Sequence, residues 1–170
     1  MSQLQTVRFS GALLLRGFWL YVWEIETVKK DRWLYVGRTG DRSSPNAQSP
    51  FTRLGQHLGS NKHANALRRH LAKIGVDPDT CRSFELSATG PILPEAATMD
   101  DHRPMRNKMA ALEYALRNAL HSAGYPVLNE LHCLQQLDEA LWKDVLEAFV
   151  VRFPKLKTVG TEARDELQTC

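Results

Sequence analysis

The stretch FWLYVWEIETVKKDRWLYVGRT, residues 18–39, has aromatic and β-branched side chains at both ends and a charged middle. Such side chains favour strands, so residues 18–25 and 33–39 predict two neighbouring strands. The polar residues between them are typical of a connection. The whole stretch therefore predicts a β-hairpin.

Alternation along these strands places two tyrosines. Successive side chains of a strand point to opposite faces of a sheet. Tyr21 thus shares a face with Trp19 and Trp23 in the first strand, and Tyr35 shares a face with Gly37 in the second. The two tyrosines can therefore lie on a common surface.

A helical pattern follows the hairpin. Ser49 is the expected N-cap and Pro50 the expected first helical residue. Within this helix Arg53 and His57 stand four positions apart. Residues at that spacing project from one helical face, so the arginine and the histidine are expected side by side.

The first half of the chain is strongly basic. Residues 27–73 contain ten Lys or Arg against two Asp, which gives this segment a net charge of about +8. A second, amphipathic helix is expected over about residues 62–74. The basic side of this helix carries Lys62, Arg69 and Lys73. These residues either face nucleic acid or are ordinary solvated charges. Concentrated positive charge of this kind is typical of a surface that binds phosphates.

The later half of the chain is mainly helical. Residues 82–89 alternate as a third strand would, and residues 90–98 predict an irregular connection. The longest helical pattern covers about residues 100–122, with Pro104 in its first turn and Glu113 at the border of its apolar stripe. An extended link at 125–130 that contains Asn129 and a last helix over about 134–150 complete the pattern. Together these elements predict an α/β (α+β) fold, in which helices flank a small central mixed or antiparallel sheet that starts with the hairpin.

Composition narrows the class of protein. A chain of 170 residues suits one domain with an appendage. Three widely spaced cysteines, Cys81, Cys133 and Cys170, fit neither a disulfide framework nor a zinc motif, and we expect reduced thiols and a cytoplasmic location. The apolar stretch at residues 11–23 is interrupted by Arg16 and is too short to span a bilayer, so no membrane association is expected.

The residue types suggest phosphodiester hydrolysis. A phenol or an imidazole can accept a proton from an attacking water. A guanidinium and a divalent metal ion can neutralise the charge that develops on the phosphate. One carboxylate can hold Mg²⁺ when water and phosphate oxygens complete the coordination shell, so Glu113 would suffice as the protein ligand.

The order of these motifs resembles the GIY-YIG endonuclease family. The segments WLY at 19–21 and YVG at 35–37 resemble its two triplets, and RLGQH at 53–57 resembles its Arg–His helix. The segment LEYAL around Glu113 resembles its metal-binding helix, and VLN at 127–129 its terminal asparagine element. The resemblance covers residues 17–130, which we expect to form a nuclease domain, with residues 131–170 as a C-terminal helix and polar tail packed on that domain or trailing from it.

The resemblance implies a nuclease that cleaves DNA with one Mg²⁺ or Mn²⁺ per active site. Tyr35 would act as the general base and Tyr21 would orient the phosphate or the water, with the reverse assignment open. Arg53 would bind the scissile phosphate, and His57 would assist proton transfer or position Tyr21. Glu113 would ligate the metal. The expected contacts to nucleic acid come from Gly37, Arg38, Lys62, Arg69, Lys73 and Asn129, of which Asn129 would alternatively brace the site.

Two alternatives accompany this reading. In another register Gly17, Phe18 and Trp19 would take the place of the first triplet, which would leave it without a tyrosine. The chain could also be a nucleic-acid-binding module without catalysis, or a subunit that positions DNA for another enzyme. If it is a nuclease, a double-strand break would require a homodimer or two successive encounters, because one active site cuts one strand. The sequence leaves open the substrate preference and the biological role.

Overall fold

The computed structural model describes residues 4–41, 44–59 and 65–158. Its centre is a three-stranded antiparallel sheet of β1 (Phe18–Glu26), β2 (Arg32–Arg38) and β3 (Ser83–Leu93), in the order β2-β1-β3. The predicted hairpin is confirmed, with Tyr21 opposite Gly37 and Trp23 opposite Tyr35. The predicted third strand was too short, because β3 continues through Gly90 and Pro91 and pairs with β1 as far as Leu93.

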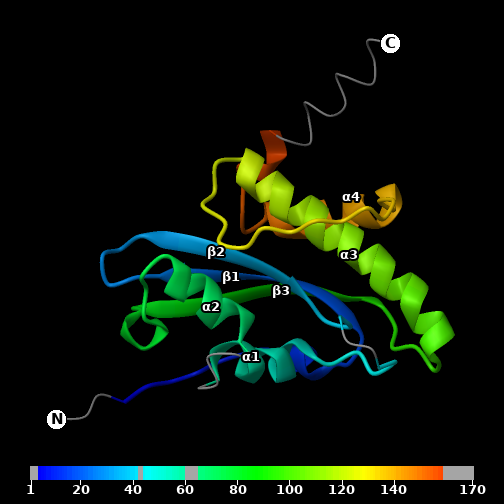
Figure 1. Cartoon of the computed structure of the whole chain (residues 1–170), viewed down its shortest axis with the longest axis horizontal. Helices are drawn as coiled ribbons and strands as arrows, with labels where there is room; N and C mark the ends of the chain where they lie inside the picture. The colour runs from blue at the N-terminus through cyan, green and yellow to red at the C-terminus, as the bar shows by residue number, and fades with distance from the viewer. Residues whose placement is uncertain (1–3, 42–43, 60–64, 159–170) are drawn as a thin grey trace.

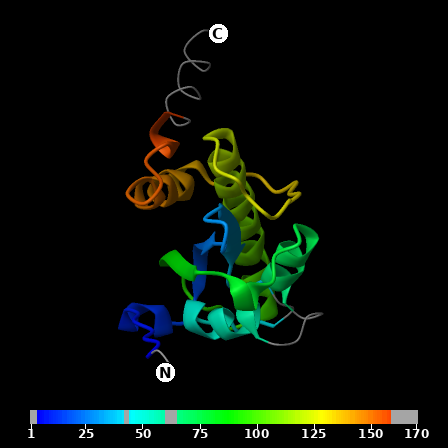
Figure 2. The same ribbon diagram turned by 90° about the vertical axis from the view of Figure 1, so that its left-hand side faces the viewer.

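Helices cover both faces of the sheet, which gives the mixed α+β class expected (Figure 1). Figures 1 and 2 show α3 and α4 on one face and α1 and α2 on the other. In chain order the helical elements are η1 (Gly11–Leu14), α1 (Pro50–Leu58), α2 (Ala66–Lys73), η2 (Pro78–Thr80), α3 (Met99–Ser122) and α4 (Glu139–Val150). No helix in the described ranges combines the length and apolarity needed to cross a bilayer.

The caps explain where the helices begin. The Ser49 side chain accepts a hydrogen bond from the Thr52 amide at 3.3 Å and Pro50 follows as the first helical residue, so the predicted start of α1 is confirmed. The predicted start of α4 near residue 134 is wrong, because Asp138 caps the helix by accepting from the amide of Leu141 at 3.3 Å.

Two further helix predictions need correction. Thr98 accepts a hydrogen bond from the Asp101 amide at 3.2 Å, so α3 begins at Met99 and Pro104 lies inside the helix rather than in its first turn. The second helix begins at Ala66, later than the sequence pattern indicates. Lys62, which was expected on that helix, lies outside the described residues.

The sheet has a hydrophobic core on each side. On one side the buried residues Phe18, Leu20 and Val22 pack with α3 and α4. On the other side Trp23 and Ile25 pack with α2. Phe149 of α4 and Phe153 just after it belong to the same cluster as Phe18, so the C-terminal helix is packed on the body that carries the sheet.

The outer edge of β2 is covered by the link that follows α3. The Leu34 amide donates to the carbonyl of Pro126, and the Leu128 amide donates to the carbonyl of Leu34, both at 2.8 Å. Val127 forms a parallel bridge with Leu34. This segment thus continues the sheet beyond β2 and fixes the position of Asn129.

Candidate active site

Six of the predicted residues form one group at the β2 side of the sheet, which we call the polar cluster: Tyr21, Tyr35, Arg38, Arg53, His57 and Glu113. The strands supply the tyrosines and Arg38, α1 supplies Arg53 and His57, and α3 supplies Glu113. Four of them, Tyr21, Tyr35, Arg53 and Glu113, interact electrostatically with one another. The fold therefore assembles side chains that are up to 92 positions apart, from Tyr21 to Glu113.

Tyr21 and His57 make the closest polar contact of the cluster. The Tyr21 hydroxyl lies 2.6 Å from Nε2 of His57, and it can also donate to the Arg38 carbonyl at 3.3 Å. Both side chains are buried, with Tyr21 1% and His57 4% exposed. Trp19 does not occupy this position: its indole N–H donates to the carbonyl of Leu15 at 3.1 Å.

Burial decides the protonation of this pair. It raises the pKa of Tyr21 well above its ordinary value, although the nearby Arg53 charge opposes the shift. Burial also lowers the pKa of His57 to about 4, and the Arg53 charge adds to that effect. At neutral pH the phenol is therefore protonated and the imidazole is neutral.

Tyr35 also contacts His57. Its ring contacts His57 edge-on with 5.3 Å between ring centroids, and contacts His70 at 5.7 Å. Burial raises the pKa of Tyr35, and the negative charge of Glu113 raises it further. Tyr35 is the more exposed tyrosine of the two, at 7%.

Arg53 reaches the tyrosines from α1 while its guanidinium is held by two neighbours. Nη2 donates to Oδ2 of Asp41 at 2.8 Å, and Nη1 donates to Oε1 of Gln56 at 3.0 Å. Its Nε is buried and has no hydrogen-bond partner among the residues that the structure describes. One donor of Arg53 is thus unsatisfied within the cluster.

Glu113 points toward the sheet, where it meets Arg38. Nε of Arg38 donates to Oε2 of Glu113 at 2.8 Å, and Nη1 of Arg38 donates to the carbonyl of Arg106 at 3.3 Å. The two side chains are only 16% and 15% exposed. Burial raises the pKa of Glu113, and the Arg38 charge works against that rise. Arg38, expected at the nucleic acid, is thus paired inside the cluster.

Asp41 is the member of the site that sequence reasoning missed. Besides accepting from Arg53, its charge raises the pKa of both Glu113 and Tyr35. A single aspartate in a polar loop has no periodic pattern that would single it out. Its position three residues after Arg38, just beyond the end of β2, is the one signal that could have indicated it.

Gly37 and Asn129 have structural tasks next to the cluster. A Cβ on Gly37 would lie 2.4 Å from Cε2 of Tyr21, so the glycine leaves room for the tyrosine ring. Asn129 is buried, and its side-chain amide accepts from the Val36 amide at 3.0 Å and donates to the Val36 carbonyl at 2.8 Å. Its geometry is that of a brace on β2.

The remaining predicted basic residues lie on α2. Arg69 and Lys73 are exposed, on the side of the helix away from the buried Leu67 and Leu71. The Arg69 charge acts on Tyr35, lowering its pKa against the effect of burial. This exposed side of α2 is therefore within electrostatic range of the polar cluster.

A metal ion in this site would need oxygen, nitrogen or sulfur ligands from the side chains. In the described ranges no group of three or more His, Cys, Asp and Glu side chains is placed to hold a metal ion. Glu113 offers a hard carboxylate oxygen, and Mg²⁺ needs few protein ligands because it keeps several waters. A hydrated ion bound through Glu113 would have to replace the present contact of that carboxylate with Arg38.

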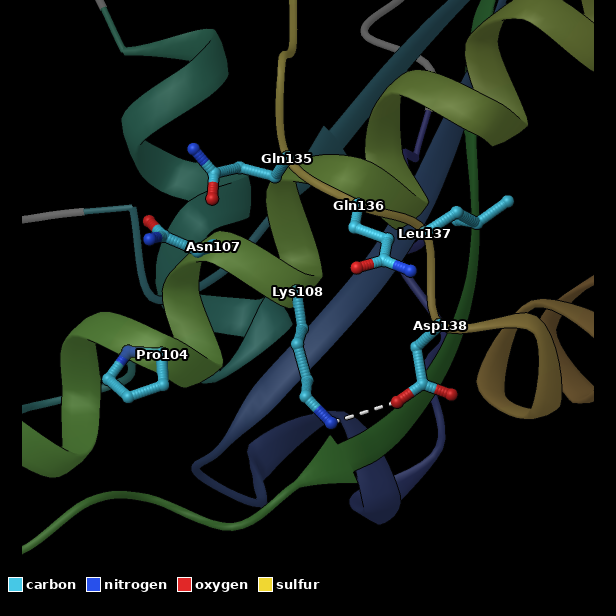
Figure 3. Close-up of a pocket in the computed structure, with 7 residues that line it drawn as sticks. All are labelled: Pro104, Asn107, Lys108, Gln135, Gln136, Leu137 and Asp138. Carbon is cyan, nitrogen blue, oxygen red and sulfur yellow. Dashed lines mark hydrogen bonds and ion pairs between the residues drawn. The ribbon is translucent and has the colours of Figure 1, made fainter.

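A separate cavity of about 470 Å³ lies between α3 and the segment before α4 (Figure 3). Figure 3 shows the ion pair between Lys108 and Asp138, 2.8 Å long, beside this cavity. The lining side chains, mostly polar, are Pro104, Asn107, Lys108, Gln135, Gln136, Leu137 and Asp138. None of them belongs to the polar cluster, so the cavity is a distinct surface feature.

Comparisons of the chain with protein-family models, with curated proteins and with solved structures find no match. The polar cluster therefore supplies the observations that bear on function.

Proposed function

We propose that this chain is a metal-dependent endonuclease of the GIY-YIG type that hydrolyses phosphodiester bonds in DNA. The observation that carries the proposal is the 2.6 Å contact between the Tyr21 hydroxyl and a neutral His57, with Arg53 and Glu113 in electrostatic contact with the same tyrosine. A proton acceptor, a phosphate-binding cation and a metal-binding carboxylate are the three groups that such hydrolysis requires.

In this mechanism Arg53 binds the scissile phosphate through its guanidinium and neutralises charge in the transition state. Glu113 would hold a divalent ion, which would supply further positive charge near the phosphate. A water attacks phosphorus, the bond from phosphorus to the 3′ oxygen breaks, and the leaving 3′ oxygen takes a proton from solvent. The products end in a 5′-phosphate and a 3′-hydroxyl, as the family resemblance implies.

The proton of the attacking water needs an acceptor. The phenolic oxygen of Tyr21 takes it while its own proton passes to Nε2 of His57, across the 2.6 Å contact. In this relay the buried phenolate never has to exist on its own, and a phosphate bound at Arg53 offsets the positive charge that helps to lower the pKa of His57. Tyr35 is the second candidate for the acceptor, since it is more exposed and its ring also contacts His57.

Plasmid cleavage tests the proposal. The purified chain is incubated with supercoiled plasmid in Mg²⁺ or Mn²⁺, and nicking is compared between the wild type, Glu113→Gln and Arg53→Ala. Each substitution is expected to slow cleavage by about 10²–10³-fold, the usual cost of removing one transition-state contact. Tyr21→Phe should slow it far more than Tyr35→Phe if Tyr21 carries the relay, and the reverse order would assign the relay to Tyr35.

Matched controls are available on the surface. Glu147 is an exposed carboxylate on α4, and Arg103 is an exposed arginine on α3. Glu147→Gln and Arg103→Ala should cleave like the wild type. Equal cleavage by Glu113→Gln and the wild type would sink the nuclease proposal.

One observation favours a second function, a nucleic-acid-binding module or DNA-positioning subunit without catalysis. Glu113 and Arg53 are already neutralised, by Arg38 and by Asp41. If the chain binds a labelled duplex with a steep dependence on salt but leaves plasmid intact in both metals, this second function replaces the first.

A further inference from the structure

Two ion pairs meet in the polar cluster, and they have the same pattern. Arg53 is held by Asp41 and Glu113 is held by Arg38, each across 2.8 Å. Both arginines are largely buried, with 15% and 16% of their side chains exposed. In each pair, the residue that would bind a ligand in the proposed function already forms an ion pair with a side chain of opposite charge.

Asp41 and Arg38 each have the same sign of charge as the ligand whose place they take. A carboxylate and a phosphate both accept hydrogen bonds from a guanidinium through negatively charged oxygens, so Asp41 takes the place of a phosphate on Arg53. A guanidinium on a carboxylate oxygen neutralises it as a cation would, so Arg38 takes the place of a metal ion on Glu113. Without ligands, Arg53 and Glu113 therefore each have a protein partner of opposite charge.

The two pairs are also coupled. The charges of both Asp41 and Arg53 act on Glu113, so the four charged groups form one electrostatically neutral unit. A phosphate that arrived alone at Arg53 would displace Asp41 and leave two anions close together. A cation that arrived alone at Glu113 would displace Arg38 and leave two cations close together. When both arrive, each displaced residue faces a ligand of opposite charge.

We propose that Asp41 and Arg38 are positioning residues that keep the site closed to either ligand alone and exchange partners when a DNA phosphate and a divalent cation arrive together. The exchange rests on the proposed function, because it uses the same Arg53 and Glu113. Replacing Asp41 should therefore strengthen DNA binding, and replacing Arg38 should strengthen metal binding. Such coupling between two ligands is reciprocal by thermodynamic necessity.

The role of Asp41 is tested by DNA binding without metal. Anisotropy of a labelled duplex is measured in EDTA for the wild type, Asp41→Asn and Asp79→Asn. Asp79 is the matched control, because it holds Arg68 at 2.7 Å and that arginine is also 15% exposed. Asp41→Asn is expected to tighten binding by about five-fold or more, the lower range of typical coupling. Asp79→Asn should change it far less, and equal changes in the two variants would overturn the exchange.

The role of Arg38 is tested by binding of Mn²⁺ without DNA. Free Mn²⁺ is measured by electron paramagnetic resonance for the wild type, Arg38→Gln and Arg38→Gln combined with Glu113→Gln. Arg38→Gln should bind Mn²⁺ about five-fold more tightly than the wild type, and the double variant should lose the gain. A circular dichroism melt of each variant reports folding, and Asp41→Ser and Arg38→Met replace any variant that fails to fold. An Arg38→Gln affinity no greater than that of the wild type would also overturn the exchange.

Failure of the exchange and failure of the proposed function give different results. The two failures are separated by measuring binding with duplex and Mn²⁺ present together. If Arg53→Ala and Glu113→Gln then weaken binding, while Asp41→Asn and Arg38→Gln change nothing in the single-ligand experiments, only the exchange is wrong. If Arg53→Ala and Glu113→Gln bind duplex and Mn²⁺ together as the wild type does, the proposed function is wrong as well.

Discussion

At the scale of single residues, Gly37 governs the geometry of the candidate site. A Cβ at this position would approach Cε2 of Tyr21 to 2.4 Å and its hydroxyl oxygen to 2.7 Å. Gly37→Ala should therefore push the ring away from His57 and cost about 1–3 kcal/mol in the free energy of unfolding, as overpacking usually does. Urea denaturation measures this cost, and the ring displacement is seen as a change in the Tyr21 and His57 proton resonances.

Gly55 provides the control for this substitution. It lies in the middle of α1, is exposed, and has nothing within 4 Å of the position of a Cβ. Gly55→Ala should stabilise the protein by about 0.5–1 kcal/mol, because alanine favours a helix. A loss of stability at Gly55 similar to that at Gly37 would show that the close approach to Tyr21 is not the cause.

His57 gives stability a defined pH dependence. The folded protein keeps it neutral down to a pKa of about 4, whereas an unfolded chain binds that proton near its ordinary value of about 6.5. The unfolded state therefore binds more protons in this range, and the free energy of unfolding should fall as the pH drops from about 6.5 to about 4. His57→Gln should remove about 2–3 kcal/mol of that fall, measured by urea denaturation at each pH.

His132 is the matched control for the pH experiment, because it is an exposed histidine outside the polar cluster. His132→Gln is measured at the same pH values. If His57→Gln alters the pH dependence of stability no more than His132→Gln does, another group is responsible for the fall.

The sequence predicts some members of the site and not others, for physical reasons. Arg53 and His57 were predictable because helical spacing alone places them together. The pairing of Arg38 with Glu113 was not, since it joins residues 75 positions apart and depends on how α3 crosses β2. Asp41 was missed because a lone carboxylate in a loop has no neighbours in sequence that indicate its partner.

At the scale of elements, Arg152 ties the end of α4 to the sheet. It binds Glu24 of β1 and Glu85 of β3, two carboxylates that stand directly opposite each other. Like charges facing across a strand pair are destabilising. Arg152→Ala should therefore lower the free energy of unfolding by about 1 kcal/mol, because the arginine is partly exposed, and adding Glu85→Gln should recover part of it.

Arg82 offers a comparison without the second carboxylate. It pairs with Glu26 at 3.3 Å, and the residue opposite Glu26 on β3 is Ser83. Arg82→Ala should have a smaller effect than Arg152→Ala. If the Arg152 effect is not relieved by Glu85→Gln and does not shrink in high salt, repulsion between Glu24 and Glu85 is not its source.

Element boundaries were less predictable than element types. The hairpin and α1 follow local patterns and a local cap, and both were predicted. β3 runs past the expected end because pairing with β1 overrides the usual effect of Gly90 and Pro91. The start of α4 was predicted too early, because the apolar spacing extends upstream of the cap at Asp138.

At the scale of the whole molecule, α4 shares its core with the sheet. Phe149 is 3% exposed and packs in the cluster that contains Phe18 and Leu20. Phe149→Ala should cost about 3–5 kcal/mol through the cavity it leaves, and amide exchange should accelerate in β1 as well as in α4. Phe149→Leu gives a milder test if the alanine variant does not fold.

Val151 is the control for the shared core, because it lies two residues further on and is 87% exposed. Val151→Ala should change stability by less than about 0.5 kcal/mol. If Phe149→Ala accelerates exchange in α4 alone, the C-terminal helix is an independently opening unit and not part of one cooperative body.

The link at residues 126–129 also limits how the molecule can associate with copies of itself. Backbone groups of β2 that would otherwise attract a foreign strand are already bonded to this link and to Asn129. In the described part of the chain β3 has a strand partner on only one side. We therefore expect a fibril or dimer that grows by adding strands to begin at β3.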